Sequence, residues 1–207
     1  MQSFGVLIGR AFLYVLFIVG VAQLITLEGY SQLSESTYNE VSLTEKMQDL
    51  FGFLSCVFFL VAARMSTELR PIAVMLAALT GMMFIRESDS FLDHNVFDGA
   101  WQALVSVVIV ATIVFLKKKT QPIKPSIVEY ARLPSAGVLL SGILVTFVFS
   151  RLFGRRSFWE AVMGDNYVRV VKNIVEEGTE LMGYALILIA AIELVLHVFV
   201  KNKREQA

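Results

Sequence analysis

Apolar runs of membrane-spanning length constrain the fold of this chain more than any other feature. They lie at about residues 4–27, 47–65, 71–91, 99–116, 133–150 and 180–200. A bilayer core of ~30 Å needs about 20 helical residues, and each run reaches that length once its flanking turns are included. The stretch VSVVIVATIVF shows none of the alternation expected of barrel strands. We therefore expect an all-α, polytopic membrane bundle of six transmembrane helices, forming a single domain over residues 1–207.

The composition supports a membrane protein over a soluble bundle. Hydrophobic residues make up 56% of the chain and charged residues 17%, whereas a soluble domain is roughly a quarter charged. Too little polar sequence remains to coat six buried helices in water. The net charge is zero, which gives no general basic bias toward nucleic acid. The single cysteine, Cys56, excludes an internal disulfide.

Lysine and arginine in the short loops indicate the orientation. With both termini inside, ten of them lie in cytoplasmic segments and seven on the opposite side, which we call outer. Positive residues favour the cytoplasmic side. We expect an integral protein of a bacterial inner (plasma) membrane with both termini cytoplasmic. The zero net charge then reflects a cancellation between a basic inner face and an acidic outer one.

Two polar segments separate spans without forming domains. Residues 28–46 are acidic and polar, which is typical of a solvated linker. Residues 117–133, with the edge of the next span, contain Pro122, Pro125 and Pro134. Proline favours extended or turn backbone, so we expect a loop there.

The segment at residues 151–178 has a different pattern. Aromatic and aliphatic residues alternate with Arg155, Arg156 and Glu160, as in a helix lying at a membrane interface. We expect one or two short interfacial helices there. Gly178 would allow a bend or a fresh start before the last span.

Charged residues inside the spans are costly, at about 2.5–3.5 kcal/mol each near mid-bilayer. Arg10 and Glu193 fall at similar depths from the cytoplasmic side, and His197 lies one turn from Glu193. We expect Arg10 to pair with Glu193. This pair would fix the packing of the first and last helices, or Glu193 and His197 would form a proton relay.

A second group of charges gathers at the outer ends of the third, fifth and sixth spans. If the third helix runs on past its apolar stretch, one face carries Arg86, Asp89 and Asp93. The candidate site as a whole comprises Arg86, Glu87, Asp89, Asp93, His94, Arg151, Glu176, Glu177 and Glu180.

The chemistry of this outer group admits several interpretations. Carboxylates with an imidazole suit a divalent cation, and arginines suit phosphate or carboxylate groups. A purely structural interpretation has Asp93 or Asp98 capping helices and Arg86 satisfying Glu180. No cofactor is specified beyond such a divalent cation.

The leading functional hypothesis is a non-enzymatic membrane protein that binds or transports a cation, a proton or a small anionic group at the outer site. The main alternative is a metal-dependent membrane enzyme acting on a lipid or isoprenoid headgroup. A third is an accessory subunit of a membrane complex, with a partner subunit or a second copy of the chain as its partner. The sequence contains no H-E-x-x-H, G-x-S-x-G, P-loop or dinucleotide motif to favour an enzyme.

Overall fold

The computed structural model describes residues 4–34, 42–118 and 122–206, and these residues form helices and turns without any strand. Five of the helices are long and apolar enough to cross a membrane, or up to six if one bent pair counts as a single span. The predicted all-α fold, with several helices long and apolar enough to cross a membrane, is therefore confirmed. The exact number of six spans stays a prediction.

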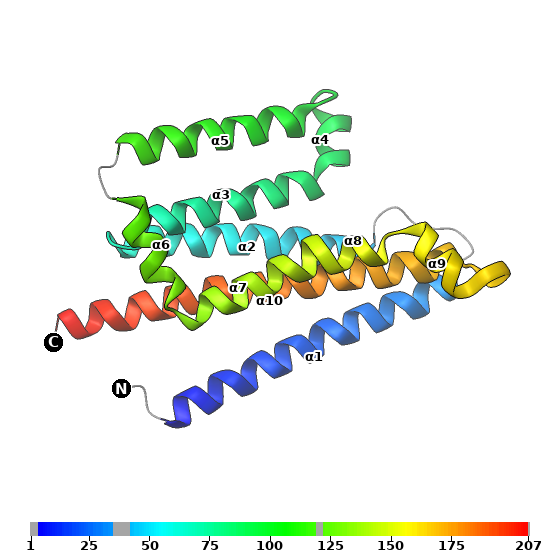
Figure 1. The fold of residues 1–207 in the computed structure, drawn as a ribbon, viewed down its shortest axis with the longest axis horizontal. Coiled ribbons are helices and arrows are strands. Elements are labelled where there is room, and N and C mark those ends of the chain that lie inside the picture. Colours follow the sequence, from blue (N-terminus) through cyan, green and yellow to red (C-terminus); the bar gives the residue numbers. More distant parts are fainter. Residues whose placement is uncertain (1–3, 35–41, 119–121, 207) are drawn as a thin grey trace. The chain divides into compact units, whose positions relative to one another are not determined.

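Helices follow one another along the whole described chain (Figure 1). They are α1 (Phe4–Ser34), α2 (Leu43–Met65), α3 (Arg70–Glu87), α4 (Asp89–Asn95), α5 (Ala100–Lys118), α6 (Ile123–Ala131), α7 (Pro134–Leu144), the π-helix η1 (Val145–Phe149), α8 (Ser150–Phe153), α9 (Arg156–Met163), the short 3₁₀ helix η2 (Gly164–Asn166) and α10 (Arg169–Glu205).

The chain divides into two compact units. The first unit comprises Met1–Met47 and Ser141–Ala185, and the second comprises Gln48–Leu140 and Leu186–Ala207. The prediction of one domain over residues 1–207 stays a prediction.

The segment expected to be a linker is largely helical where it is described. α1 continues to Ser34, seven residues beyond the predicted end at residue 27, and Glu28 is only 7% exposed. α2 begins at Leu43 because Ser42 and Glu45 form a reciprocal capping box. The Ser42 hydroxyl accepts the Glu45 N–H at 3.0 Å, and the Glu45 carboxylate accepts the Ser42 N–H at 3.3 Å. Residues 35–41 lie outside the described residues.

In the second unit, α2, α3 and α5 form the packed helices. The rings of Phe53 and Phe84 lie 5.7 Å apart between α2 and α3, and a Cβ on Gly81 would lie 3.3 Å from the Cys56 sulfur. α5 runs antiparallel to α3 and in contact with it, and α4 joins their ends (Figure 1). Near the end of α10, the Asn202 amide donates to the Met65 carbonyl at 2.8 Å.

The third predicted span is broken. α3 ends at Glu87 and α4 leaves it at an angle of 64°, so the helix does not run on past its apolar stretch in the way considered from the sequence. Ser88 lies at the break, and its hydroxyl donates to Asp49 of α2 at 3.2 Å. The polar sequence R-E-S-D-S offers no apolar face to continue the packing of α3.

The proline-rich segment is also helical where it is described, which corrects the expected loop. Pro122 precedes α6, and Pro125 lies in its first turn. The N–H groups of a first turn have no partner within the helix, so proline costs little there. The Ser126 hydroxyl of α6 accepts the backbone N–H of Ile72 at 3.2 Å, which fastens α6 to the start of α3.

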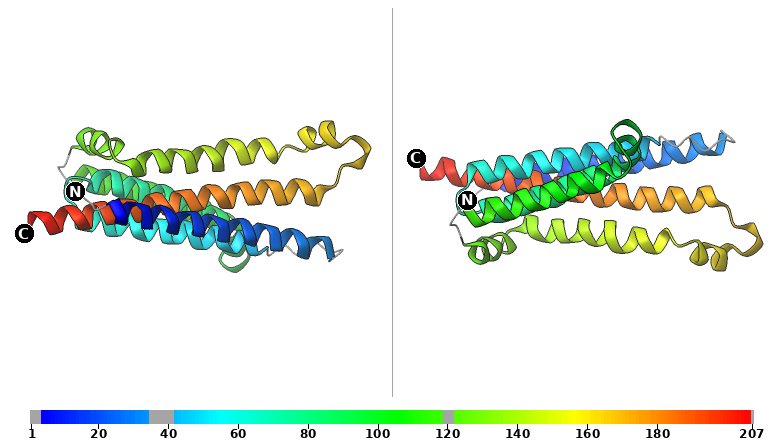
Figure 2. Two further views of the ribbon diagram at one scale, coloured as in Figure 1. Left: turned by 90° about the horizontal axis from the view of Figure 1, so that it is seen from below. Right: turned by 90° about the horizontal axis from the view of Figure 1, so that it is seen from above.

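In the first unit, the chain reverses through α9 and η2, so that α8 and the start of α10 run antiparallel (Figure 2). The Trp159 indole N–H of α9 donates to the Phe153 carbonyl of α8 at 2.5 Å. α10 passes through Gly178 without a break, so the fresh start that this glycine would allow does not occur there. Gly178 instead permits close packing, because a Cβ there would lie 2.9 Å from Ile25 of α1.

Candidate functional site

The predicted outer group is divided between the two units. Arg86, Glu87, Asp89, Asp93 and His94 belong to the second unit, whereas Arg151, Glu176, Glu177 and Glu180 belong to the first. Their convergence on one site stays a prediction. Each half, however, has a defined internal geometry.

In the second unit, side chains of the predicted outer group stabilise the local backbone around α4. Arg86 pairs with Asp89 across the α3–α4 break, with Nη1 and Oδ2 at 3.1 Å. Asp93 Oδ1 accepts the N–H groups of Gly99 and Ala100 at 3.2 and 3.1 Å. Asp93 therefore caps the start of α5, as the structural interpretation expected. His94 is exposed on α4, and Glu87 is the half-buried last residue of α3.

The half in the first unit places three glutamates along the beginning of α10. Lys172 Nζ lies 2.7 Å from Glu176 one turn away, and the Ser42 hydroxyl donates to Glu177 at 3.4 Å. Glu176 also lies against Gly154, where a Cβ would come within 2.1 Å of its carboxylate. These two carboxylates therefore have separate partners.

Glu180 is the most buried of these glutamates, at 8% exposure. Its Oε1 atom accepts the Ser150 hydroxyl at 3.1 Å and lies 3.0 Å from Nη2 of Arg151. Arg151 of the same unit is thus paired with Glu180. The expected contact with Arg86, which belongs to the second unit, stays a prediction. The Arg151 side chain is 53% exposed, so Glu180 lies between a buried hydroxyl and a cation that reaches water.

A π-helical turn places the Ser150 hydroxyl. η1 interrupts the α7–α8 helix, and the Ser150 N–H donates to the Val145 carbonyl, five residues back. In an α-helix that N–H would donate to the Thr146 carbonyl. The Ser150 hydroxyl donates to that carbonyl instead. Single π turns inside α-helices are frequent at functional sites.

Thr146, in the same π turn, carries a buried hydroxyl without a hydrogen-bond partner among the described residues. The residue is 3% exposed. Its Oγ1 atom would lie 2.0 Å from a Cβ on Gly183, so it fills the space that this glycine leaves on α10. Gly183 is three residues beyond Glu180 and hence about one turn away. An unsatisfied buried hydroxyl costs about 1–3 kcal/mol, so its position needs a reason.

The predicted intramembrane pair cannot be placed in one unit. Arg10 lies on α1 of the first unit, and Glu193 and His197 lie on the part of α10 that belongs to the second. Glu193 is half-buried and His197 is exposed. The Arg10–Glu193 contact and the relay through His197 both stay predictions.

The described residues do not build a centre for a divalent metal. Residues 4–34, 42–118 and 122–206 contain no group of three or more histidine, cysteine, aspartate or glutamate side chains that could hold a metal ion. The predicted site glutamates of the first unit instead contact a lysine (Glu176), an arginine (Glu180) and a serine (Glu177). Within either unit, the described residues therefore form no cluster of three such ligands for the divalent cation considered from the sequence.

Sequence reasoning missed the hydroxyl groups around Glu180. Thr146 and Ser150 are spaced T-x-x-x-S near the end of an apolar span, which puts both on one helix face toward a neighbour. That spacing was a usable signal, whereas the π turn had none. Comparisons with models of known protein families, with curated proteins and with solved structures find no match.

Proposed function

We propose that this chain is a non-enzymatic, multi-pass membrane protein that binds a small monovalent cation, an alkali ion, at Glu180. The observation that carries the proposal is the combination of the buried Glu180 carboxylate with the unpartnered Thr146 hydroxyl, which lies against Gly183 about one turn along α10. We further propose six spans, a bacterial inner membrane location and cytoplasmic termini, on the apolar runs and the distribution of lysine and arginine.

The atoms around Glu180 favour a cation over the other ligands considered. Hard cations take carboxylate, hydroxyl and carbonyl oxygens, and all three types occur at Glu180, Ser150 and Thr146. A small anion would face the negative charge of Glu180. A proton would need only the carboxylate, and the hydroxyls would then have no part in binding. In transporters, interrupted helices often supply the oxygens that hold an alkali ion.

Arg151 has a defined part in this proposal. It is the counter-ion that a bound cation would displace from Glu180, and its half-exposed side chain can turn toward water. Without the Arg151 side chain, a cation would not have to displace this positive charge in order to bind Glu180. Loss of the Arg151 charge should therefore strengthen cation binding, whereas a purely structural pair predicts destabilisation alone.

Thermal unfolding of the purified protein tests the proposal. The protein is heated in the chlorides of lithium, sodium, potassium and N-methylglucamine at equal ionic strength. A ligand at ten times its Kd stabilises the folded protein by ~1.4 kcal/mol. The Tm in the chloride of one alkali ion should therefore be higher than the Tm in N-methylglucamine chloride. We expect Arg151→Gln to increase this difference and Glu180→Gln to abolish it.

Glu160→Gln is the matched control, because Glu160 also pairs with an arginine, Arg156 at 2.7 Å, but is exposed on α9. It should respond to alkali ions as the native protein does. The proposal fails if neither the native protein nor Arg151→Gln distinguishes alkali ions from N-methylglucamine. It also fails if Glu180→Gln keeps the full difference.

A further inference from the structure

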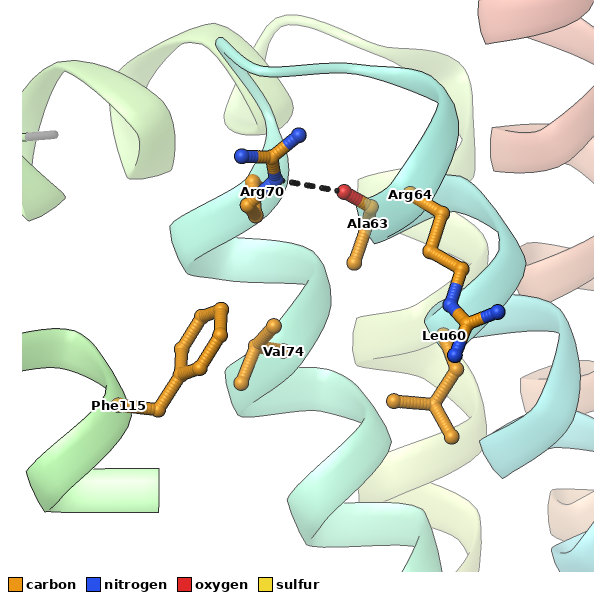
Figure 3. A pocket seen from close by; sticks show the side chains of 6 residues that line it. All are labelled: Leu60, Ala63, Arg64, Arg70, Val74 and Phe115. Atoms are coloured by element: carbon orange, nitrogen blue, oxygen red, sulfur yellow. Dashed lines mark hydrogen bonds between the residues drawn. The ribbon is translucent and has the colours of Figure 1, made fainter. Parts of the chain in front are cut away.

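A pocket of about 370 Å³ lies in the second unit, apart from Glu180 (Figure 3). It is formed where α2 ends, α3 begins and α5 approaches its last turn. Its lining residues are Leu60, Ala63, Arg64, Arg70, Val74 and Phe115. The volume is within the range of ~300–1,000 Å³ typical of small-molecule sites.

Two arginines supply the polar part of this pocket. Arg70 Nε donates to the Ala63 carbonyl at 3.0 Å, which orients the guanidinium and leaves its two terminal nitrogens available (Figure 3). The Arg64 side chain extends along α2 beside Leu60 (Figure 3). Among the described residues, neither arginine forms an ion pair, and no carboxylate lines the pocket. The positive charge is therefore not neutralised locally.

The remaining walls are apolar and belong to helices of membrane-spanning character. Leu60, Val74 and Phe115 come from α2, α3 and α5 respectively. Arg64 is in the last turn of α2, Arg70 begins α3, and Lys117 and Lys118 end α5. Basic groups thus lie at the ends of these helices, and the apolar walls begin within one or two turns of them. A bilayer has the same order, with charged headgroups at its surface and apolar acyl chains beneath them.

We propose that this pocket binds an anionic phospholipid. Arg64 and Arg70 hold the phosphate, whose oxygens match the guanidinium fork. The first methylenes of the acyl chains lie against Leu60, Val74 and Phe115. Lys117 and Lys118 strengthen the attraction to an anionic leaflet, at the end of the helices that the sequence predicts to be cytoplasmic.

Native mass spectrometry of the delipidated full-length chain tests this site. The protein is titrated with dioleoyl phosphatidylglycerol and, separately, with dioleoyl phosphatidylcholine, which has the same chains and no net charge. We expect phosphatidylglycerol to bind at least about fivefold more tightly. Arg64→Gln should lose about this factor, the effect of one basic residue near an anionic lipid. Arg64 is the preferred position because its side chain is exposed, whereas Arg70 also holds the backbone.

Two pairs of variants separate the pocket from general lipid contact. Val74→Trp fills the pocket and should remove one bound phosphatidylglycerol, whereas Val107→Trp on an exposed part of α5 should not. Arg155→Gln, at an exposed arginine outside the pocket, should bind as the native protein does. Equal affinity for the two lipids, or equal effects of Arg64→Gln and Arg155→Gln, would overturn the proposal. So would displacement of the lipid by millimolar inorganic phosphate, which would indicate a site for free phosphate.

Discussion

The Glu28 carboxylate accepts two hydrogen bonds from Thr44, one from its backbone N–H and one from its hydroxyl, both at 2.9 Å. Both residues are buried. Glu28 comes from α1, and Thr44 is in the first turn of α2, where N–H groups have no partner within the helix. A negative charge at a helix N-terminus is also favoured by the helix dipole. This contact fastens the end of α1 to the beginning of α2.

Thr44→Val should destabilise the protein by about 1–2 kcal/mol, because it removes a hydrogen bond to a buried charged group while keeping the side-chain shape. The measurement is thermal unfolding in detergent, followed by circular dichroism. Thr26→Val is the control, because the exposed Thr26 hydroxyl bonds only to the Ala22 carbonyl of its own helix. If both variants melt alike, the hydrogen bond from the Thr44 hydroxyl to Glu28 contributes no stability.

Long apolar segments were predictable because burial in lipid requires a continuous run of residues. The continuation of α1 beyond residue 27 was not predictable, because it involves a contact between Glu28 and Thr44, which are 16 residues apart in the sequence. The start of α2 was nevertheless readable from the capping box of Ser42 and Glu45. An acidic, polar composition was therefore a poor guide to which residues lie outside the helices.

Asp93→Ala should destabilise the second unit by ~1 kcal/mol, the usual cost of losing a helix cap. Asp93 accepts two backbone N–H groups at the start of α5, at 3.2 and 3.1 Å. Asp98→Ala, at an exposed neighbour, should change stability by less than about 0.5 kcal/mol. Thermal unfolding of the two variants side by side decides whether Asp93 acts as a cap. Equal melting temperatures of the two variants would show that Asp93 does not stabilise α5 as a cap.

The candidate site was only partly predictable for a related reason. Asp93 as a cap is a local relationship, and sequence reasoning named it as one of two candidate caps, with Asp98. The Arg151–Glu180 pair depends instead on how α8 returns along α10, which no local pattern in the sequence indicates. The π turn at Val145–Phe149 shifts the hydrogen-bonding register by one residue, and no apolar pattern records that shift.

Gly183→Ala should be strongly destabilising, by about 2 kcal/mol or more, because the added Cβ has no room. It would lie 2.0 Å from Thr146 Oγ1, 2.9 Å from the Thr146 backbone nitrogen and 3.0 Å from the Gly142 carbonyl. Gly20→Ala on α1 is the control, since a Cβ there meets nothing within 4 Å. That control should be neutral or slightly stabilising, as expected for alanine in a helix.

The double variant Gly183→Ala with Thr146→Ala should recover only part of the lost stability. The second substitution removes the hydroxyl but leaves the two backbone atoms close to the new Cβ. Full recovery would show that the backbone can move apart at this point. A Gly183→Ala protein as stable as Gly20→Ala would contradict the close packing of α7–α8 against α10.

Tyr130→Phe should make the protein more resistant to alkaline unfolding. Burial raises the pKa of Tyr130 on α6 from 10.0 to about 12. A raised pKa means that the contribution of Tyr130 to stability is complete below pH 10 and is lost between pH 10 and 12, by up to about 2–3 kcal/mol. Phenylalanine does not ionise, so the variant should lose less stability than the native protein over that range.

Below pH 10 the variant should be equally or more stable, because the Tyr130 hydroxyl has no hydrogen-bond partner among the described residues. Denaturant unfolding at several pH values, with Tyr30→Phe at an exposed tyrosine as control, measures the difference. Parallel loss of stability in all three proteins between pH 10 and 12 would contradict it.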